Sequence, residues 1–129
     1  MNSVTFFNNK TKGQQHQFLS NLLADALFDN CWATADIDDD DYNTYHHDND
    51  CTEDVWARAL MNYCPLYIYD HEDSEEHEIT LTSILRALDQ CRDEEPKVWA
   101  RVISEDGSAD CYDCDAILQY AVFEEWIYG

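Results

Sequence analysis

The sequence predicts an α+β fold, in which a small antiparallel sheet of three to four strands packs against four to five helices. Three observations predict it. Apolar residues recur at helical spacing in several segments, and short β-prone segments lie between those helices. Apolar residues also make up 45% of the 129 residues and aromatic residues 13%, which is enough for one buried core. We therefore expect a single domain spanning residues 1–129.

The first third of the chain is expected to contain a strand, a helix and a second strand. Residues 3–7 are β-prone and precede a turn-like segment, so they predict the first strand. Apolar side chains at helical spacing in residues 14–29 predict the first helix. Residues 31–37 predict the second strand. The polar, acidic segment 38–50 predicts a loop.

The middle third predicts a helix followed by a hairpin. Thr52 is expected to cap the second helix, because acids at the next two positions suit a helix N-terminus, and Pro65 ends it. Residues 66–69 then predict a strand, residues 70–76 an acidic turn, and residues 78–81 the returning strand.

The last third predicts three further helical segments. Thr82 or Ser83 is expected to cap the first of them, and Pro96 suits the first turn of the second. The third is expected from residue 110 to residue 127. Asp113 and Asp115 should cap this helix or face solvent, with Trp126 and Tyr128 anchoring its end.

Charge is the most unusual property of the sequence. The chain has 28 Asp and Glu against 7 Lys and Arg, a formal net charge of -21 and a pI near 4.1. Residues 1–35 are neutral overall, so the negative charge belongs to residues 36–129. Such a field repels nucleic acid and anionic membranes and attracts basic surfaces. We therefore expect neither direct nucleic-acid binding nor membrane binding.

Two acidic clusters hold much of this charge and are the predicted partner-binding residues. The first covers residues 36–54 and the second residues 70–78. The residues in them that are predicted to bind the partner are Asp36, Asp38, Asp39, Asp40, Asp41, Asp48, Asp50, Glu53, Asp54, Asp70, Glu72, Asp73, Glu75 and Glu76.

The amount of charge is comparable with that of duplex DNA. A domain of this length has a radius of gyration of roughly 14 Å and hence a diameter of about 36 Å. About 36 Å of duplex DNA carries on the order of 21 charges. The sequence thus favours a protein that mimics nucleic acid and blocks a basic nucleic-acid-binding protein. If so, the two acidic clusters should lie on one face.

Three alternatives remain open at this stage. The acidity could serve adaptation to high salt without mimicry. The chain could sequester a small molecule or nucleotide signal, which needs arginines aimed at phosphates. It could also be a metal- or carboxylate-dependent enzyme, although no catalytic residues can be assigned from the sequence.

Metal and redox motifs are weak, and no cofactor is expected. Cys111-x-x-Cys114 has a metal-like spacing, but the chain has no second such pair, and the neighbouring aspartates would raise the pKa of the thiols. Asp36, Asp38 and Asp40 have the spacing of a calcium loop, but Asp41 occupies the position that requires glycine. We expect the six cysteines to be mostly buried free thiols in a reducing cytoplasm.

The C-terminal segment resembles the ending of a group of small, largely uncharacterised phage and mobile-element proteins. The matching residues are Asp113, Asp115, Ile117, Gln119, Tyr120, Ala121, Phe123, Glu125, Tyr128 and Gly129. Residues 31–33 and 78–82 match the group more loosely, and Glu124 stands where the group usually has glycine.

This resemblance implies a viral or mobile-element origin and the host bacterial cytoplasm, and it brings no catalytic residues. By composition the chain is also similar to phage antirestriction and anti-CRISPR DNA mimics. The implied partner is a basic nucleic-acid-binding protein of a restriction or CRISPR defence system. Whether the chain acts as a monomer or a homodimer stays open.

Overall fold

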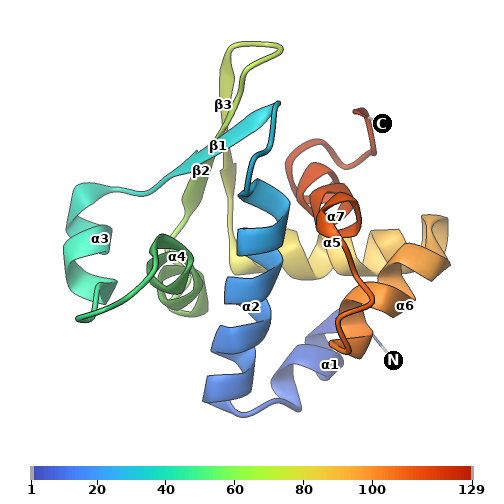
Figure 1. Cartoon of the computed structure of the whole chain (residues 1–129), viewed down its shortest axis with the longest axis horizontal. Helices are drawn as coiled ribbons and strands as arrows, with labels where there is room; N and C mark the ends of the chain where they lie inside the picture. The colour runs from blue at the N-terminus through green and yellow to red at the C-terminus, as the bar shows by residue number, and fades with distance from the viewer. Residues whose placement is uncertain (1, 129) are drawn as a thin grey trace.

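The computed structural model describes residues 2–128 and confirms the α+β fold (Figure 1). Within these residues, the helices are α1 (Ser3–Asn8), α2 (Lys12–Leu27), α3 (Asp39–Tyr45), α4 (Thr52–Met61), α5 (Leu81–Glu94), α6 (Pro96–Ser104) and α7 (Cys111–Phe123). The strands are β1 (Ala33–Asp36), β2 (Leu66–Asp70) and β3 (Glu75–Ile79). Gly129, the last residue of the tail motif, lies outside the described residues.

The three strands form one antiparallel sheet in the order β1-β2-β3. Ala35 of β1 pairs with Ile68 of β2, which pairs with His77 of β3. In Figure 1 the β2–β3 hairpin extends beyond the helices, with α3 and α4 on one side of it and α7 on the other. The sheet therefore has one face toward the helical core and one toward solvent.

The core is formed mainly by helices. Helix α2 packs against α4 and α7, and α5 packs against α6 and α7. Their largest fully buried side chains include Leu19, Leu60, Leu88, Ile117 and Tyr120. Burial of these aliphatic and aromatic groups is the main term that stabilises the fold.

Capping residues explain where the helices begin. Thr11, Thr80 and Asp110 each accept a hydrogen bond from the backbone three residues later, and each belongs to a reciprocal capping box. The cap of α5 is thus Thr80 rather than Thr82 or Ser83, and Ser83 is its partner in the box. Similarly, Cys51 rather than Thr52 is the N-cap of α4.

Two short helices replace elements predicted otherwise, which raises the number of helices to seven among the described residues. The expected strand at residues 3–7 is wrong, because Asn2 caps helix α1 and Phe7 packs into the core. The expected loop at residues 38–50 is also wrong in its first half, where α3 forms. Three aspartates lie in the first turn of α3, where the helix dipole favours negative charge.

Helix α7 ends at Phe123, four residues before the predicted end, because the chain turns at Glu124. The tail after it packs back on the fold: Tyr128 donates its hydroxyl to buried Asp70 (2.8 Å), so it anchors the end as predicted. Asp113 is part of the capping box of α7, also as predicted. Asp115 neither caps nor faces solvent freely, since Asn30, Trp32 and Gln119 all donate to its carboxylate.

Glu124 has a φ of 60°, in the left-handed region that favours glycine. We expect Glu124→Gly to raise the free energy of unfolding by about 1 kcal/mol, because glycine adopts this conformation without strain. Urea denaturation measures the change, and Glu125→Gly is the control because the φ of Glu125 is not positive. An E124G variant that is no more stable than E125G would contradict this explanation.

Candidate functional site

The outward face of the sheet brings the two acidic clusters together. Asp36 of β1 pairs with Tyr67 of β2, and Tyr67 pairs with Glu78 of β3. In the next row, Thr34 pairs with Tyr69, and Tyr69 with Glu76. Side chains two residues apart on a strand share one face. Asp36 therefore lies on the same face as Glu76 and Glu78.

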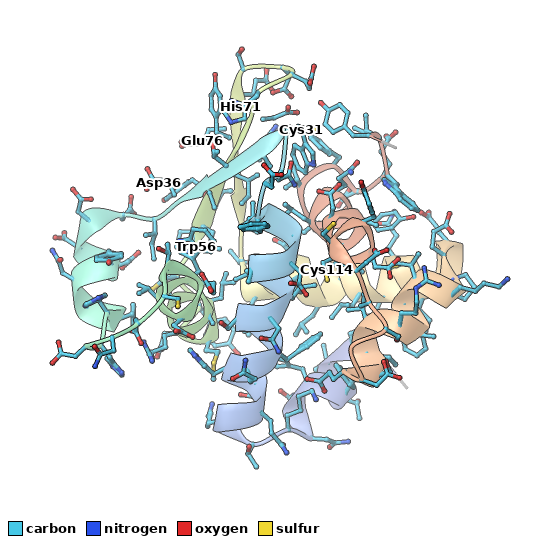
Figure 2. All side chains as sticks on the ribbon, viewed as in Figure 1. Cys31, Asp36, Trp56, His71, Glu76 and Cys114 are labelled. Atoms are coloured by element: carbon cyan, nitrogen blue, oxygen red, sulfur yellow. The ribbon has the colours of Figure 1, made fainter. Side chains whose placement is uncertain are left out.

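This surface continues toward α3. The hydroxyl of Tyr67 donates to Asp38 Oδ2 (3.3 Å), and Asp38 is the N-cap of α3. Partial burial and the negative charges of Asp38, Glu78 and Glu76 raise the pKa of Tyr67, so these carboxylates act on the same tyrosine. Figure 2 shows Asp36 and Glu76 on the side of the sheet away from α7.

We call the set Asp36, Asp38, Tyr67, Tyr69, Glu76 and Glu78 the acidic face. Asp39 and Asp40 are exposed and Asp41 is half-buried in the adjoining first turn of α3, so they extend its charge. The strands that carry this face contain no Lys or Arg. One contiguous surface thus presents negative charge around two tyrosine rings.

Other predicted residues lie beside this face or serve the fold. Glu72, Asp73 and Glu75 are exposed in or next to the hairpin turn, and Asp48 is exposed before α4. Glu53 is half-buried in a pocket beside Trp56. These residues add to the negative field without belonging to the acidic face.

Asp50 and Asp54 bind other parts of the chain. Asp50 forms an ion pair with Arg58, and the hydrogen bond from this guanidinium lowers the pKa of Asp50 to about 2. Burial opposes ionisation of Asp54, but hydrogen bonds from His16, the backbone of Cys51 and Ser20 outweigh it and lower its pKa. Both carboxylates hold α4 in place, so we assign them to structure.

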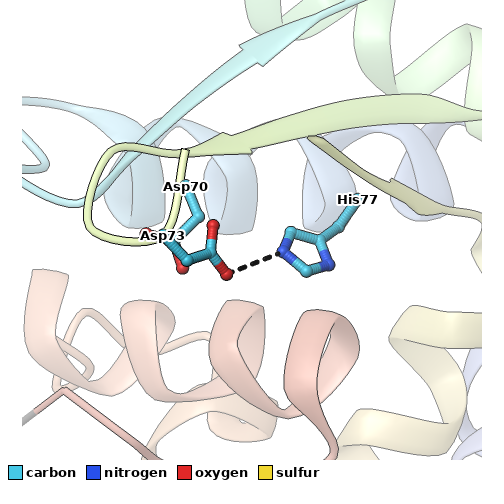
Figure 3. A group of neighbouring side chains, drawn as sticks. All are labelled: Asp70, Asp73 and His77. Carbon is cyan, nitrogen blue, oxygen red and sulfur yellow. Dashed lines mark ion pairs between the residues drawn. The ribbon is translucent and has the colours of Figure 1, made fainter. Parts of the chain in front are cut away.

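Asp70 lies on the opposite face of the sheet and is fully buried. It stands near Asp73 of the turn and His77 of β3, and one ligand atom from each residue lies within 4.8 Å of the others (Figure 3). The sequence placed Asp70 and Asp73 in the partner-binding set, but Asp70 has no exposed surface to offer a protein. His77 is absent from the predicted site because the sequence predicts a turn at residues 70–76 and a returning strand at residues 78–81. The strand β3 instead begins at Glu75 and includes His77.

The Cys111-x-x-Cys114 pair has no third ligand among the described residues. Cys111 is exposed, whereas Cys114 is buried, and burial raises the pKa of the Cys114 thiol to about 12. A thiol that stays protonated is a poor nucleophile and a poor metal ligand. The three aspartates with calcium-loop spacing do not form a ligand cluster either, within residues 2–128.

The arginines that a nucleotide-binding site would need are already paired with carboxylates of the chain. Each forms an ion pair with a carboxylate, and the pairs are Arg58–Asp50, Arg86–Glu124, Arg92–Asp89 and Arg101–Asp113. Arg101 is the arginine that lines the pocket beside Phe18, and Asp113 holds it through two hydrogen bonds of 2.8 and 2.7 Å. No observation therefore favours a phosphate-binding pocket.

The fold and the site together define a small α+β protein with an acidic, tyrosine-containing sheet face. Comparison with protein-family models, curated proteins and solved structures finds no match. The resemblance of the tail to phage proteins accordingly stays a prediction. Within residues 2–128, no helix combines the length and the apolar character needed to cross a membrane.

Proposed function

We propose that this chain inhibits a nucleic-acid-binding protein by covering its basic binding site with the acidic face. The observation that carries the proposal is the strand register, which places Asp36 and Glu78 on either side of Tyr67, with Glu76 and Asp38 adjacent. Charges that are far apart in the sequence thus become neighbours on one surface.

The chemistry of this face suits the side chains that bind phosphates. Arg and Lys form strong charge-assisted hydrogen bonds with carboxylates as well as with phosphates. Glu76 and Glu78 are separated by about 6.6 Å along the strand, given a rise of about 3.3 Å per residue. The rings of Tyr67 and Tyr69 add surfaces on which arginine side chains can stack. A basic groove that binds the phosphates of a nucleic-acid backbone would therefore contact similar negatively charged groups on the acidic face.

The proposed setting follows from the tail resemblance and from composition. We infer a phage-type anti-defence inhibitor that acts in the host bacterial cytoplasm on a restriction or CRISPR protein. General adaptation to high salt differs from this proposal in one respect: it needs acidity anywhere on the surface, and no particular face.

Two variants that remove the same number of negative charges distinguish binding through the acidic face from general adaptation to high salt. The face variant combines Asp36→Asn, Glu76→Gln and Glu78→Gln. The control variant combines Asp29→Asn, Asp93→Asn and Glu125→Gln, three exposed acids elsewhere, and changes the net charge equally. Each chain is immobilised and exposed to lysate from bacteria that carry restriction or CRISPR systems.

We expect the parent chain and the control to capture a basic protein that duplex DNA, RNA or rising salt releases. The face variant should bind that protein at least about tenfold more weakly, because the contacts that it loses are charge-assisted. Equal weakening by both variants, or capture that neither nucleic acid nor salt reverses, would contradict the proposal.

A further inference from the structure

The buried side of the hairpin carries a second cluster, Asp70, Asp73 and His77, which the proposed function does not use. Asp70 ends β2, Asp73 lies in the turn at residues 71–74, and His77 belongs to β3. Figure 3 shows the three side chains converging in the space between the hairpin and α7. Two carboxylates and one imidazole thus face a common point.

Two carboxylates, one of them buried, lie close together here, and His77 is their basic neighbour. Asp70 is fully buried and accepts hydrogen bonds from the Glu72 backbone and the Tyr128 hydroxyl, both at 2.8 Å. Two neighbouring carboxylates repel each other, and a bound cation would offset that repulsion.

His77 supplies a nitrogen of the kind that binds metal ions. Its Nε2 atom has no access to solvent and no hydrogen-bond partner, and it lies 3.5 Å from Asp73 Oδ2. The ring packs edge-to-face on Phe123, with centroids 5.2 Å apart and an interplanar angle of 77°. This contact fixes the orientation of the imidazole toward the two carboxylates.

We propose that Asp70, Asp73 and His77 bind one divalent transition-metal cation of the Mn²⁺ class, with water completing its coordination. Carboxylate oxygens suit Mn²⁺, and imidazole nitrogen is a common ligand of first-row transition metals. Bonds of roughly 2.1 Å would bring the ligand atoms to about 3 Å apart. Asp73 can supply that movement, because its side chain is 39% exposed and lies in the turn.

The bound cation would connect the hairpin to the C-terminal tail, since Asp70 also receives the hydroxyl of Tyr128. Binding to the folded state alone stabilises it by mass action. The site lies on the opposite face of the sheet from the acidic face, so the inference does not depend on the proposed function.

Titration with Mn²⁺ followed by electron paramagnetic resonance tests the proposal, because bound and free Mn²⁺ give different signals. Mn²⁺ is preferable to Zn²⁺ as a probe, since six free thiols would compete for zinc. We expect one tight site per chain and a rise in the thermal unfolding midpoint when Mn²⁺ is added. His77→Gln and Asp73→Asn should each weaken binding at least tenfold.

Glu76→Gln is the matched control, because it removes one negative charge next to His77 but on the opposite face of the sheet. This variant should bind Mn²⁺ with an affinity within twofold of that of the parent chain. Circular dichroism checks that all variants are folded. Equal binding by the parent and H77Q overturns the proposal, as does equal weakening by E76Q and D73N. Absence of Mn²⁺ binding also overturns it, and would indicate that His77 serves only as an ion-pair partner of Asp73.

Discussion

Replacing Asp115 by Leu is expected to lower the free energy of unfolding by roughly 3 kcal/mol. The Asp115 carboxylate accepts hydrogen bonds from Asn30 Nδ2, Trp32 Nε1 and Gln119 Nε2, each at 2.8 Å. Asn30 and Trp32 belong to the segment between α2 and β1, and Gln119 belongs to α7. Leu has the same number of side-chain heavy atoms but accepts none of the bonds, and it leaves the buried Trp32 indole without an acceptor.

Two further variants isolate the hydrogen bonds from the change in charge. Asp115→Asn keeps an oxygen for Asn30 and Trp32 but turns an N–H group toward Gln119, so we expect a loss of about 1 kcal/mol. Asp93→Asn removes an exposed carboxylate and should leave stability nearly unchanged. Urea denaturation at neutral pH measures all three, and a D115L variant as stable as D93N would refute the role assigned to Asp115.

Much of the fold could be predicted because most helices carry clear periodicity and capping signals. The two elements that were missed had weaker or conflicting signals. Residues 3–7 contain Val4, Thr5 and two phenylalanines, all typical of strands, but packing of Phe7 into the core and the Asn2 cap favour a helix. At residues 38–41 the aspartate run suggested a solvated loop. The dipole argument used for Thr52 would have predicted α3 as well.

The candidate site was harder to predict, because register decides which acids share a face. Nothing in the sequence fixes that Asp36 lies across Tyr67 from Glu78, so only the structure could join the two clusters. The burial of Asp70 did have a signal: it follows Leu66 and Ile68 at intervals of two, and alternation places all three on the inner face. The internal roles of Asp50 and Asp54 depend on Arg58 and His16, which meet them only through tertiary packing.

Gln119→Leu is the second substitution with a large expected effect, because this fully buried amide holds the C-terminal tail. Its oxygen accepts from the backbone N–H groups of Ile127 (3.0 Å) and Tyr128 (2.7 Å), and its nitrogen donates to the carbonyl of Tyr128 (2.9 Å). We expect the free energy of unfolding to fall by about 2–4 kcal/mol. The loss is limited because the backbone of a released tail can form hydrogen bonds with water. Faster amide exchange in the tail should accompany it. Gln17→Leu, an exposed change on α2, is the control.

Combining the two substitutions shows whether Asp115 and Gln119 act as one network. Gln119 Nε2 donates both to Asp115 and to Tyr128, so each single variant already removes the bond between the two side chains. The double variant D115L/Q119L should therefore lose less stability than the sum of the single variants, with a coupling of about 1–2 kcal/mol. Strict additivity would show that the tail and the Trp32 contact are held independently. In that case Asp115 and Gln119, which both belong to the tail motif, would stabilise the fold separately. They would not form one network that links the C-terminal tail to Trp32.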